Sequence, residues 1–479
     1  VILFGSELKS IMLHPSFQKN IDFNALGSFL RHGWIAAPYT IFESTFKLKP
    51  GHYFEINLNN RKTKEYCYWN VHDFYNMENR TISFDDAKEE LHVLLKSACE
   101  YRMVADTEVG IFLSGGFDSS TVAAILQSSR SKKINTFSIG FEEEKFNEAP
   151  FAKAVANHLG TNHHEVICTA KDALELISDL PYFYDEPFAD SSAIPTMLVS
   201  KLASTKVKVS LSADGGDEIF GGYPRYYDNM GDFNKVMAIP DILRKLISKL
   251  LWLPMNLTKS RNPLYQVRLE KLKRSLEYKK PTDIFRFRSE PFKFSDKEIR
   301  QLLKEKNINL ALKTYYDDID VLNSTDPASI MMALEYKTTL VDDVLVKVDR
   351  ATMAYSLEGR EPFLDHRLVE FSARFNRDYH YRNMNTKSLL REICYQYIPK
   401  ELMDRPKKGF AIPTDKWLNN ELKDMVMEFS RTEFIKKQGI FETKSCARMI
   451  NNYYRGFDHD GERIWFFLMF QMWYNKWMV

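Results

Sequence analysis

From about residue 86 onwards, short apolar runs alternate with longer stretches of helical periodicity. The apolar runs cover residues 109–113, 134–139, 164–168 and 207–211, and helical patterns cover 87–102, 119–128 and 149–159. Strands separated by helical segments of this length are typical of βαβ units, in which the strands run parallel. The pattern therefore predicts an α/β domain built on a parallel sheet, followed from about residue 230 by a mostly helical C-terminal region.

The part of the chain up to residue 75 has a different pattern and is predicted to be β-rich with one helix. Residues 52–58 and 62–69 resemble two strands, and Asn59-Asn60 between them is a turn dipeptide that tolerates positive φ. A polar stretch at 70–86 follows, where we place a domain boundary. The sequence does not start with methionine, so we expect it to begin within a domain whose unpaired strand edges reduce the solubility or order of this part.

Composition narrows the class of protein. The 66 Lys and Arg residues nearly balance 64 Asp and Glu residues, so no chain-wide basic field for nucleic acid is expected. The five cysteines are scattered without a CxxC pair, which favours free thiols in a reducing cytoplasm. The most apolar stretch, 464–479, is shorter than the ~20 residues of a membrane span, and we expect a terminal helix docked on the core. A cytoplasmic globular protein is predicted.

The first loop that carries candidate chemistry is SGGFDSS at residues 114–120, between a predicted strand and a predicted helix. Glycine amides, serine hydroxyls and a helix N-terminus suit a phosphate group, and Asp118 adds a carboxylate suited to Mg²⁺. The lysine of the GxxxxGK[ST] loop is absent. The loop predicts a phosphate site, and the alternative is a helix N-cap on a glycine-rich turn.

The second loop is LSADGGDE at residues 211–218, which also follows a predicted strand. Its three carboxylates and two glycines suit metal binding and base catalysis. Alternatively, Asp217 and Glu218 simply complement a helix N-terminus. Because ligands of open parallel sheets bind at the carboxyl ends of the strands, we expect the two loops to share one site.

Together these loops resemble a known family. SGGFDSS is similar to the pyrophosphate-binding loop of the ATP-pyrophosphatase superfamily, whose fold is adenine nucleotide alpha-hydrolase-like. Four further segments resemble the signatures of asparagine synthetase and occur in that family's order: YDEPFADSSAIPT (184–196), LSADGGDEIFGGYPRY (211–226), VDRATMAYSLEGREPFLDHRLVEF (348–371) and RPKKGFAIP (405–413). The resemblance therefore assigns residues 86–479 to an asparagine synthetase domain.

The beginning of the chain fits the same family. FGSELKSIM, FKLKPGHYFEI and YCYW resemble the end of its glutaminase domain, a class II glutamine amidotransferase. The resemblance thus assigns residues 1–75 to the C-terminal remnant of that domain. The cysteine nucleophile with which the domain normally starts is not in this chain, and Cys67 is not a substitute.

The resemblance implies ATP-dependent amidation of L-aspartate to L-asparagine. ATP with Mg²⁺ adenylates the side-chain carboxylate, pyrophosphate leaves, and ammonia displaces AMP. Ammonia would come from glutamine in the full-length protein and from solution for this chain, and a homodimer is implied. Carried over to this sequence, the ATP and pyrophosphate ligands are Phe112, Ser114, Gly115, Gly116, Asp118, Ser119, Ser120, Ile139, Ser212 and Ala213, and the metal carboxylates are Asp118 and Asp217.

The family's remaining roles fall on four residues. Asp214 matches the acid–base group that removes a proton from the attacking ammonia, and Lys407 matches a loop lysine that stabilises negative charge. Arg350 and Glu358 match polar positions of the substrate pocket, although a structural pairing of Glu358 with a neighbouring arginine remains open.

One position departs from the family pattern. Ala213 stands where glycine is common, and its methyl group disfavours positive φ. We expect a negative φ and a modest effect on nucleotide affinity.

Other readings compete with this one. A related amidotransferase or cyclase could act on another carboxylic acid, such as a sugar acid, a peptide or a β-lactam precursor, although the segments 185–187 and 191–193 favour aspartate. A nucleotide-binding module without turnover is a second alternative. A zinc hydrolase on His158, His163 and His164 is a third, but without an HExxH pattern these histidines are expected to be structural.

Overall fold

The computed structural model describes residues 1–145, 147–251, 269, 272–273, 275–277, 293–310, 322–324, 326–404 and 412–479. Five parallel strands form its central sheet in the spatial order β5-β4-β3-β6-β7. Their bounds are β3 (Val109–Phe112), β4 (Asn135–Phe141), β5 (Asn162–Cys168), β6 (Val209–Leu211) and β7 (Glu358–Arg360). The predicted α/β class with a parallel sheet is confirmed.

The strand order reverses at β3. The chain moves outward from β3 through β4 to β5 and then returns to the other side of β3 with β6 and β7. Ile111 of β3 lies between Thr136 of β4 and Leu211 of β6 in the register. An open parallel sheet binds its ligand where the order reverses, beyond the carboxyl ends of the strands. The two candidate loops leave the sheet at this point.

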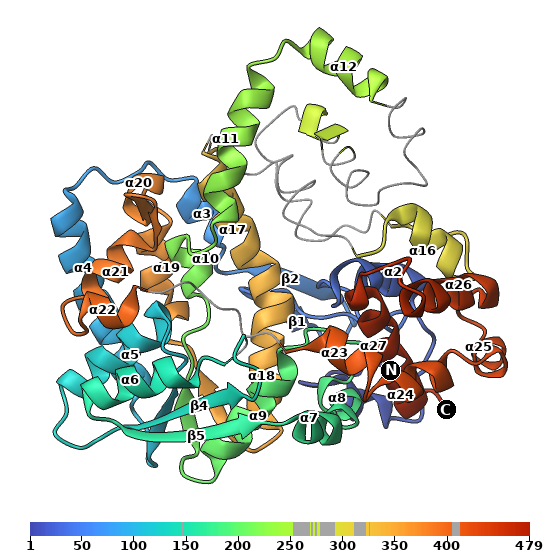
Figure 1. Cartoon of the computed structure of the whole chain (residues 1–479), viewed down its shortest axis with the longest axis horizontal. Coiled ribbons are helices and arrows are strands. Elements are labelled where there is room, and N and C mark those ends of the chain that lie inside the picture. The colour runs from blue at the N-terminus through green and yellow to red at the C-terminus, as the bar shows by residue number, and fades with distance from the viewer. Residues whose placement is uncertain are drawn as a thin grey trace.

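The sheet separates two hydrophobic cores because successive side chains of a strand point to opposite faces. Val109 and Ile111 of β3 pack into one core with α4 (Phe84–Arg102), α5 (Phe117–Ser128) and α6 (Ala149–Leu159). Phe137 and Ile139 of β4 pack into the other core with α9 (Ala193–Ser204). Figure 1 shows α5 and α6 beside the strands.

The predicted helix bounds hold closely in this part of the chain. The bounds of α6 are those predicted, α5 begins two residues before the predicted Ser119, and α4 begins three residues before the predicted Ala87. The early start of α4 has a local cause, since the Ser83 side chain accepts a hydrogen bond from the backbone N–H of Asp86 and caps the helix.

The rest of the described chain is mostly helical, as predicted. Between β5 and α18 lie α7 (Ala170–Ile177), α8 (Leu180–Tyr184), α10 (Gly216–Phe220), α11 (Arg225–Met237), α12 (Asp241–Leu250), α16 (Asp296–Leu302), α17 (Pro327–Lys337) and a π-helix (Leu340–Leu345). Then follow α18 (Val346–Met353), a 3₁₀ helix (Pro362–Leu364), α19 (His366–Ser372), α20 (Arg377–His380), the strands β8 (Tyr381–Arg382) and β9 (Asn385–Thr386), α21 (Ser388–Cys394), α22 (Lys400–Met403), α23 (Thr414–Asn419), α24 (Lys423–Phe429), α25 (Thr432–Gln438), α26 (Thr443–Tyr454) and α27 (Gly461–Trp477).

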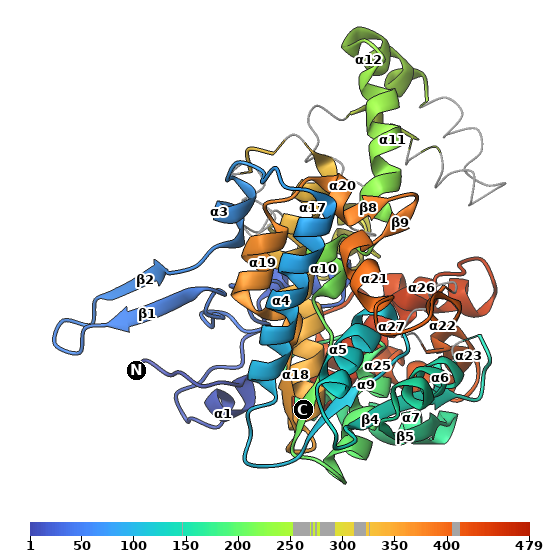
Figure 2. The ribbon, with the colours of Figure 1, turned by 90° about the vertical axis from the view of Figure 1, so that its left-hand side faces the viewer.

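The N-terminal part contains α1 (Leu8–Met12), α2 (Phe23–His32), α3 (Val71–Tyr75) and the predicted hairpin. Its strands β1 (His52–Ile56) and β2 (Thr63–Cys67) pair antiparallel and extend away from the body of the molecule (Figure 2). The turn differs from the prediction, because positive φ falls on Arg61 and not on Asn59-Asn60. The Asn57 side chain accepts hydrogen bonds from the backbone N–H groups of both asparagines and closes the turn locally.

The expected disorder of the N-terminal part is wrong for α2. This helix begins at an Asp22 N-cap, and Phe29 on it is fully buried against the C-terminal helix α27. The ring centroid of Phe29 lies 5.8 Å from that of Phe466 and 6.4 Å from that of Phe470. The expected docking of the apolar C-terminal stretch is confirmed. Across the described ranges, no helix combines the length and apolar character needed to span a membrane.

Phe29→Ala tests how far α2 contributes to the stability of the whole chain. We expect a loss of roughly 3–5 kcal/mol in the free energy of unfolding, because the truncation leaves a cavity between α2 and α27. Urea unfolding followed by tryptophan fluorescence measures it. Phe4→Ala is the control, since Phe4 is 89% exposed and its loss should change stability little. Equal stabilities for the two variants would contradict the packing.

Candidate functional site

A cavity of about 680 Å³ opens at the carboxyl ends of β3 and β6. It brings together most of the residues that the sequence predicted as nucleotide, metal and acid–base groups: Phe112, Ser114, Gly115, Gly116, Asp118, Ser119, Ile139, Ser212, Ala213, Asp214 and Asp217. Ser120 is an exception, since it is fully buried within α5. The two loops therefore share one site, as expected from the strand order.

The first loop is held in a tight conformation. Gly115 has φ +73°, and a Cβ at this position would lie 2.7 Å from the backbone nitrogen of Ala152. The Ser119 hydroxyl accepts a hydrogen bond from the Ser114 backbone N–H at 3.1 Å and lies 3.0 Å from the Ser114 hydroxyl. The residue at the N-cap of α5 is Gly116, which has no side chain with which to cap. Helix capping alone therefore does not account for the serines of this loop.

Asp118 and Asp217 converge on a lysine that the sequence analysis missed. The Lys387 ammonium pairs with Asp118 and lies 2.6 Å from Asp217 Oδ1. Burial lowers the pKa of Lys387, but the two carboxylates more than offset this and raise it above its usual value. Lys387 has φ 55° at the start of α21, in a segment that resembles none of the motifs. No local pattern marked it, because its role depends on partners far away in the sequence.

The paired carboxylates fit a magnesium ion that is shared with a phosphate group. Glycines leave room for them: a Cβ on Gly216 would lie 2.9 Å from Asp118 Cγ, and one on Gly222 would lie 1.9 Å from Asp217 Oδ1. Mg²⁺ is commonly held by one or two carboxylates plus substrate phosphates. Within the described ranges, no cluster of three or more His, Cys, Asp or Glu side chains suits a metal ion. A metal ion here would need ligands from a bound phosphate group in addition to Asp118 and Asp217.

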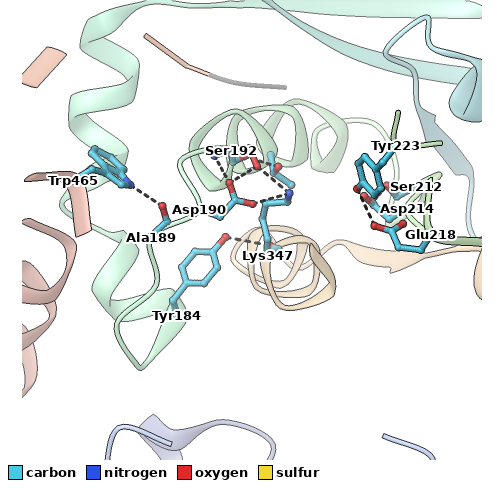
Figure 3. Close-up of polar contacts among 11 residues, drawn as sticks. Tyr184, Ala189, Asp190, Ser192, Ser212, Asp214, Glu218, Tyr223, Lys347 and Trp465 are labelled. Carbon is cyan, nitrogen blue, oxygen red and sulfur yellow. Dashed lines mark hydrogen bonds and ion pairs between the residues drawn. The ribbon is translucent and has the colours of Figure 1, made fainter. Parts of the chain in front are cut away.

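Asp214 lies beside these groups and is oriented by Ser212, whose hydroxyl donates a hydrogen bond to its carboxylate (Figure 3). Burial raises the pKa of Asp214, while the nearby Lys347 ammonium opposes that shift. Glu218 also lines the cavity and accepts a hydrogen bond from Tyr223 at 2.9 Å. Burial, assisted by the Asp217 charge, raises the pKa of Glu218 to about 8.

Ala213 conforms to the expectation for its backbone. It is not among the residues with positive φ, whereas Gly215 two positions later has φ +89°. The residue that needs the freedom of glycine in this loop is therefore Gly215, and alanine at 213 introduces no backbone strain.

Two predicted pocket residues do not line the cavity. Arg350 forms an ion pair with Glu7 of the N-terminal part, and Glu358 pairs with Arg360, 2.7 Å from its Nε. Glu358 therefore forms the pairing with a neighbouring arginine that the sequence left open as the alternative to a pocket role. Lys407 lies outside the described residues.

The three histidines of the zinc alternative have separate structural contacts. His163 lies within hydrogen-bonding distance of Thr136 and Ser138, His158 lies 2.9 Å from the carbonyl oxygen of Tyr397, and His164 lies 3.1 Å from Asn135. These contacts agree with the structural role expected for them.

Asp342 links the cavity region to the N-terminal part. Its carboxylate accepts a hydrogen bond from the backbone N–H of Ala37, 3.2 Å from each oxygen, and burial raises its pKa to about 7. The folded state therefore binds the Asp342 proton more tightly than the unfolded state does. As a result, the free energy of unfolding decreases as pH rises from the unfolded-state pKa of 3.8 to the folded-state pKa of about 7.

Asp342→Asn removes this titration. We expect the variant to gain stability relative to the unmodified chain between about pH 5 and pH 8, by roughly 1–3 kcal/mol, because each pKa unit corresponds to about 1.4 kcal/mol. Thermal unfolding across this pH range measures the difference. Asp106→Asn, at an exposed position, should follow the unmodified chain at every pH. A constant offset between the Asp342 variant and the unmodified chain would contradict the assignment.

The fold and the cavity define the class of protein. An open parallel sheet with a glycine-rich loop and paired carboxylates at its switch point is characteristic of α/β enzymes that act on phosphate-bearing ligands.

Comparison with known proteins then gives the family. The family model for asparagine synthase matches residues 90–475, and the model for a glutamine amidotransferase domain matches residues 1–69. The chain belongs to the asparagine synthase family and is a ligase of the glutamine-hydrolysing asparagine synthetase type.

Curated relatives agree with the family match. The chain is 28% identical over 487 residues to asparagine synthetase [glutamine-hydrolyzing] 1 of Bacillus subtilis, covering 99% of this chain and 72% of the relative. It is 35% identical over 355 residues to putative asparagine synthetase [glutamine-hydrolyzing] 2 of Methanocaldococcus jannaschii, covering 73% of this chain and 65% of the relative. A putative asparagine synthetase of Mycobacterium tuberculosis is 28% identical over 468 residues, with coverages of 96% and 68%. The aligned part thus spans about two thirds of each relative.

Proposed function

We propose that this chain catalyses the ATP-dependent amidation of L-aspartate to L-asparagine through a β-aspartyl-AMP intermediate, releasing AMP and pyrophosphate. The observation that supports it most is the meeting of the SGGFDSS loop with Asp118 and Asp217 in one cavity at the switch point of the sheet. Free ammonia would serve this chain, and glutamine would supply it in a full-length protein. The ATP-pyrophosphatase fold is part of this proposal.

In the first step, the loop around Gly115 binds the departing pyrophosphate. Backbone N–H groups and the hydroxyls of Ser114 and Ser119 are donors whose positions are set before ATP arrives. Asp118 and Asp217 would hold Mg²⁺, which when bound neutralises charge on the phosphate oxygens. Lys387 adds a fixed positive charge at the same place. Phe112, Ile139, Ser212 and Ala213 would line the adenosine side of the cavity, while Ser120 supports the loop from within α5.

In the second step, Asp214 accepts a proton from the ammonia nitrogen as the new C–N bond forms. A carboxylate whose pKa is raised by burial accepts this proton more readily, and Ser212 holds it in place. Lys407, assigned by the family resemblance, would stabilise negative charge on the intermediate. Arg350 and Glu358 pair with Glu7 and Arg360 and do not line the cavity, so they have no part in this step.

The domain division, the cellular location and the oligomeric state are also proposals. Matches of one family model to residues 1–69 and of another to 90–475 support a division into a glutaminase remnant at 1–75 and a synthetase domain at 86–479. The free state of the five cysteines supports a cytoplasmic location. The homodimer is inferred from family resemblance.

The test is to incubate the purified chain with Mg-ATP, ammonium and L-aspartate and to measure asparagine, AMP and pyrophosphate together. Equal amounts of all three, dependent on each substrate, are expected. Pyrophosphate release that requires a different carboxylic acid would instead support the related amidotransferases and cyclases. ATP binding without any product would contradict the proposal and favour a nucleotide-binding module.

A further inference from the structure

Among the residues that the structure describes, three cationic side chains line the cavity. Two of them have partners in the phosphate loop or in the segment around α21. Lys387 is engaged by Asp118 and Asp217. Arg391 donates to the backbone carbonyl of Thr386 at 2.9 Å and lies over the ring of Phe117, 4.0 Å from its centroid. The third cation, Lys347, has a different environment, and neither the sequence motifs nor the proposed steps assign it a role.

The Lys347 ammonium is held by a small polar network (Figure 3). Its Nζ donates to Asp190 Oδ2 and to the Ser192 hydroxyl, both at 2.9 Å. Asp190 is in turn fixed through its other oxygen, which accepts from the Ser192 backbone N–H at 2.9 Å and the Ser192 hydroxyl at 2.7 Å. An ammonium has three N–H donors. Among the residues that the structure describes, the third donor has no protein partner, and Lys347 lines the cavity.

The surroundings hold this network rigidly. The Tyr184 hydroxyl donates to the backbone carbonyl of Lys347 at 3.1 Å, and the buried ring of Trp465 donates to the backbone carbonyl of Ala189 at 2.8 Å, next to Asp190. Tyr184 also stacks on Phe188 with ring centroids 4.6 Å apart. The ammonium is therefore fixed in position before any ligand binds, which reduces the entropy lost on binding.

The two lysines that line the cavity are held by different carboxylates. Burial lowers the pKa of Lys347, but Asp190, Asp343 and Asp214 more than offset this and raise it, so the side chain stays charged. The carboxylates that act on Lys387 are instead Asp118 and Asp217. Lys347 is thus fixed by Asp190 and Ser192, whereas Lys387 is fixed by Asp118 of the phosphate loop and by Asp217.

We propose that Lys347 binds the α-carboxylate of the acceptor amino acid and that Asp190 and Ser192 are positioning residues for its ammonium. This inference rests on the proposed function and extends it to the recognition of the acceptor. The β-carboxylate has to reach the α-phosphorus of ATP at the phosphate loop, so the α-carboxylate would extend away from that loop, towards the cavity wall that Lys347 lines. A fixed ammonium there selects acceptors with a second carboxylate.

Lys347→Gln tests this proposal, because the variant should bind the acceptor amino acid more weakly. We expect the KM for L-aspartate to rise about 10- to 100-fold, the range of a lost hydrogen bond between charged groups, with the KM for ATP changed less than about twofold. β-Alanine, which is aspartate without its α-carboxylate, should be an equally poor acceptor for both proteins. Lys347→Arg, which keeps the charge, should recover part of the affinity. A rise in the KM for ATP alone would show a phosphate ligand and overturn the proposal.

Measuring the binding of L-aspartate tests this inference independently of the proposed reaction. Titration calorimetry with α,β-methylene-ATP, Mg²⁺ and L-aspartate should show binding by the unmodified chain and at least about tenfold weaker binding by Lys347→Gln. Unchanged binding by the variant, or no binding of aspartate by the unmodified chain, would overturn the assignment. Aspartate binding that depends on Lys347 in a chain that makes no asparagine would contradict only the proposed function.

Two further variants control for folding. Lys347→Gln leaves the Asp190 carboxylate without its ion pair, so the double variant Lys347→Gln/Asp190→Asn, which removes that charge, should show the same loss of aspartate binding. Lys132→Gln is the matched control, since Lys132 is exposed on the surface and pairs with Glu108 at 2.5 Å. It should bind aspartate like the unmodified chain, and a double variant that regains aspartate affinity would overturn the proposal.

Discussion

Asp118→Asn is expected to lower ATP-dependent pyrophosphate release by roughly 10²–10³-fold. Asparagine keeps the shape of the side chain but removes the charge that would hold Mg²⁺ against the phosphates. Lys387 keeps Asp217 as a partner at 2.6 Å, so the fold should survive. Pyrophosphate release under saturating ATP, aspartate and ammonium measures the effect, and thermal unfolding verifies the fold.

Asp106→Asn is the control for this experiment. Asp106 precedes the same strand, β3, on the side away from the cavity loops and is exposed. It should retain full activity. If Asp118→Asn also retains full activity, the assignment of Asp118 to the metal and phosphate site is wrong.

The second large effect is expected from Gly115→Ala. The φ of +73° disfavours a side chain, and the new Cβ would lie 2.7 Å from the nitrogen of Ala152 and 2.8 Å from the carbonyl carbon of Phe151. Both neighbours are backbone atoms of α6, so the loop itself has to move. We expect ATP affinity to fall more than about tenfold and stability to fall by roughly 1–3 kcal/mol. ATP binding by calorimetry and urea unfolding measure the two effects.

Gly439→Ala separates backbone strain from the lack of space. Gly439 has a similar φ, +75°, but a Cβ there meets nothing within 4 Å among the described residues, and Gly439 does not line the cavity. It should lose roughly 1 kcal/mol of stability and keep its ATP affinity. If Gly115→Ala weakens ATP binding no more than Gly439→Ala does, the loop does not bind the nucleotide.

Local pattern was sufficient for much of the architecture. The alternation of apolar and amphipathic segments predicted a parallel sheet, and the helix at 149–159 has the predicted bounds, because periodicity and end signals lie within a few residues of one another. The same holds for the two glycine-rich loops, since a short run of Gly, Ser and Asp after a strand constrains its own conformation. The predicted turn at Asn59-Asn60 was less accurate because several residues of that loop compete for the position with positive φ.

The amino-acid sequence by itself thus determined the fold class, the family resemblance and the two loops that meet at the cavity. Only the tertiary structure decided that Lys387 pairs with Asp118 and Asp217 and that Lys347 pairs with Asp190. It also decided that Arg350 pairs with Glu7 and does not line the cavity. The reason is physical: helices, turns and glycine-rich loops are specified by neighbours along the chain, whereas the partner of a charged side chain is set by packing between segments hundreds of residues apart. The packing of α2 against α27 was likewise decided by the tertiary structure, because burial of apolar surface is non-directional and no sequence motif identifies the partner helix.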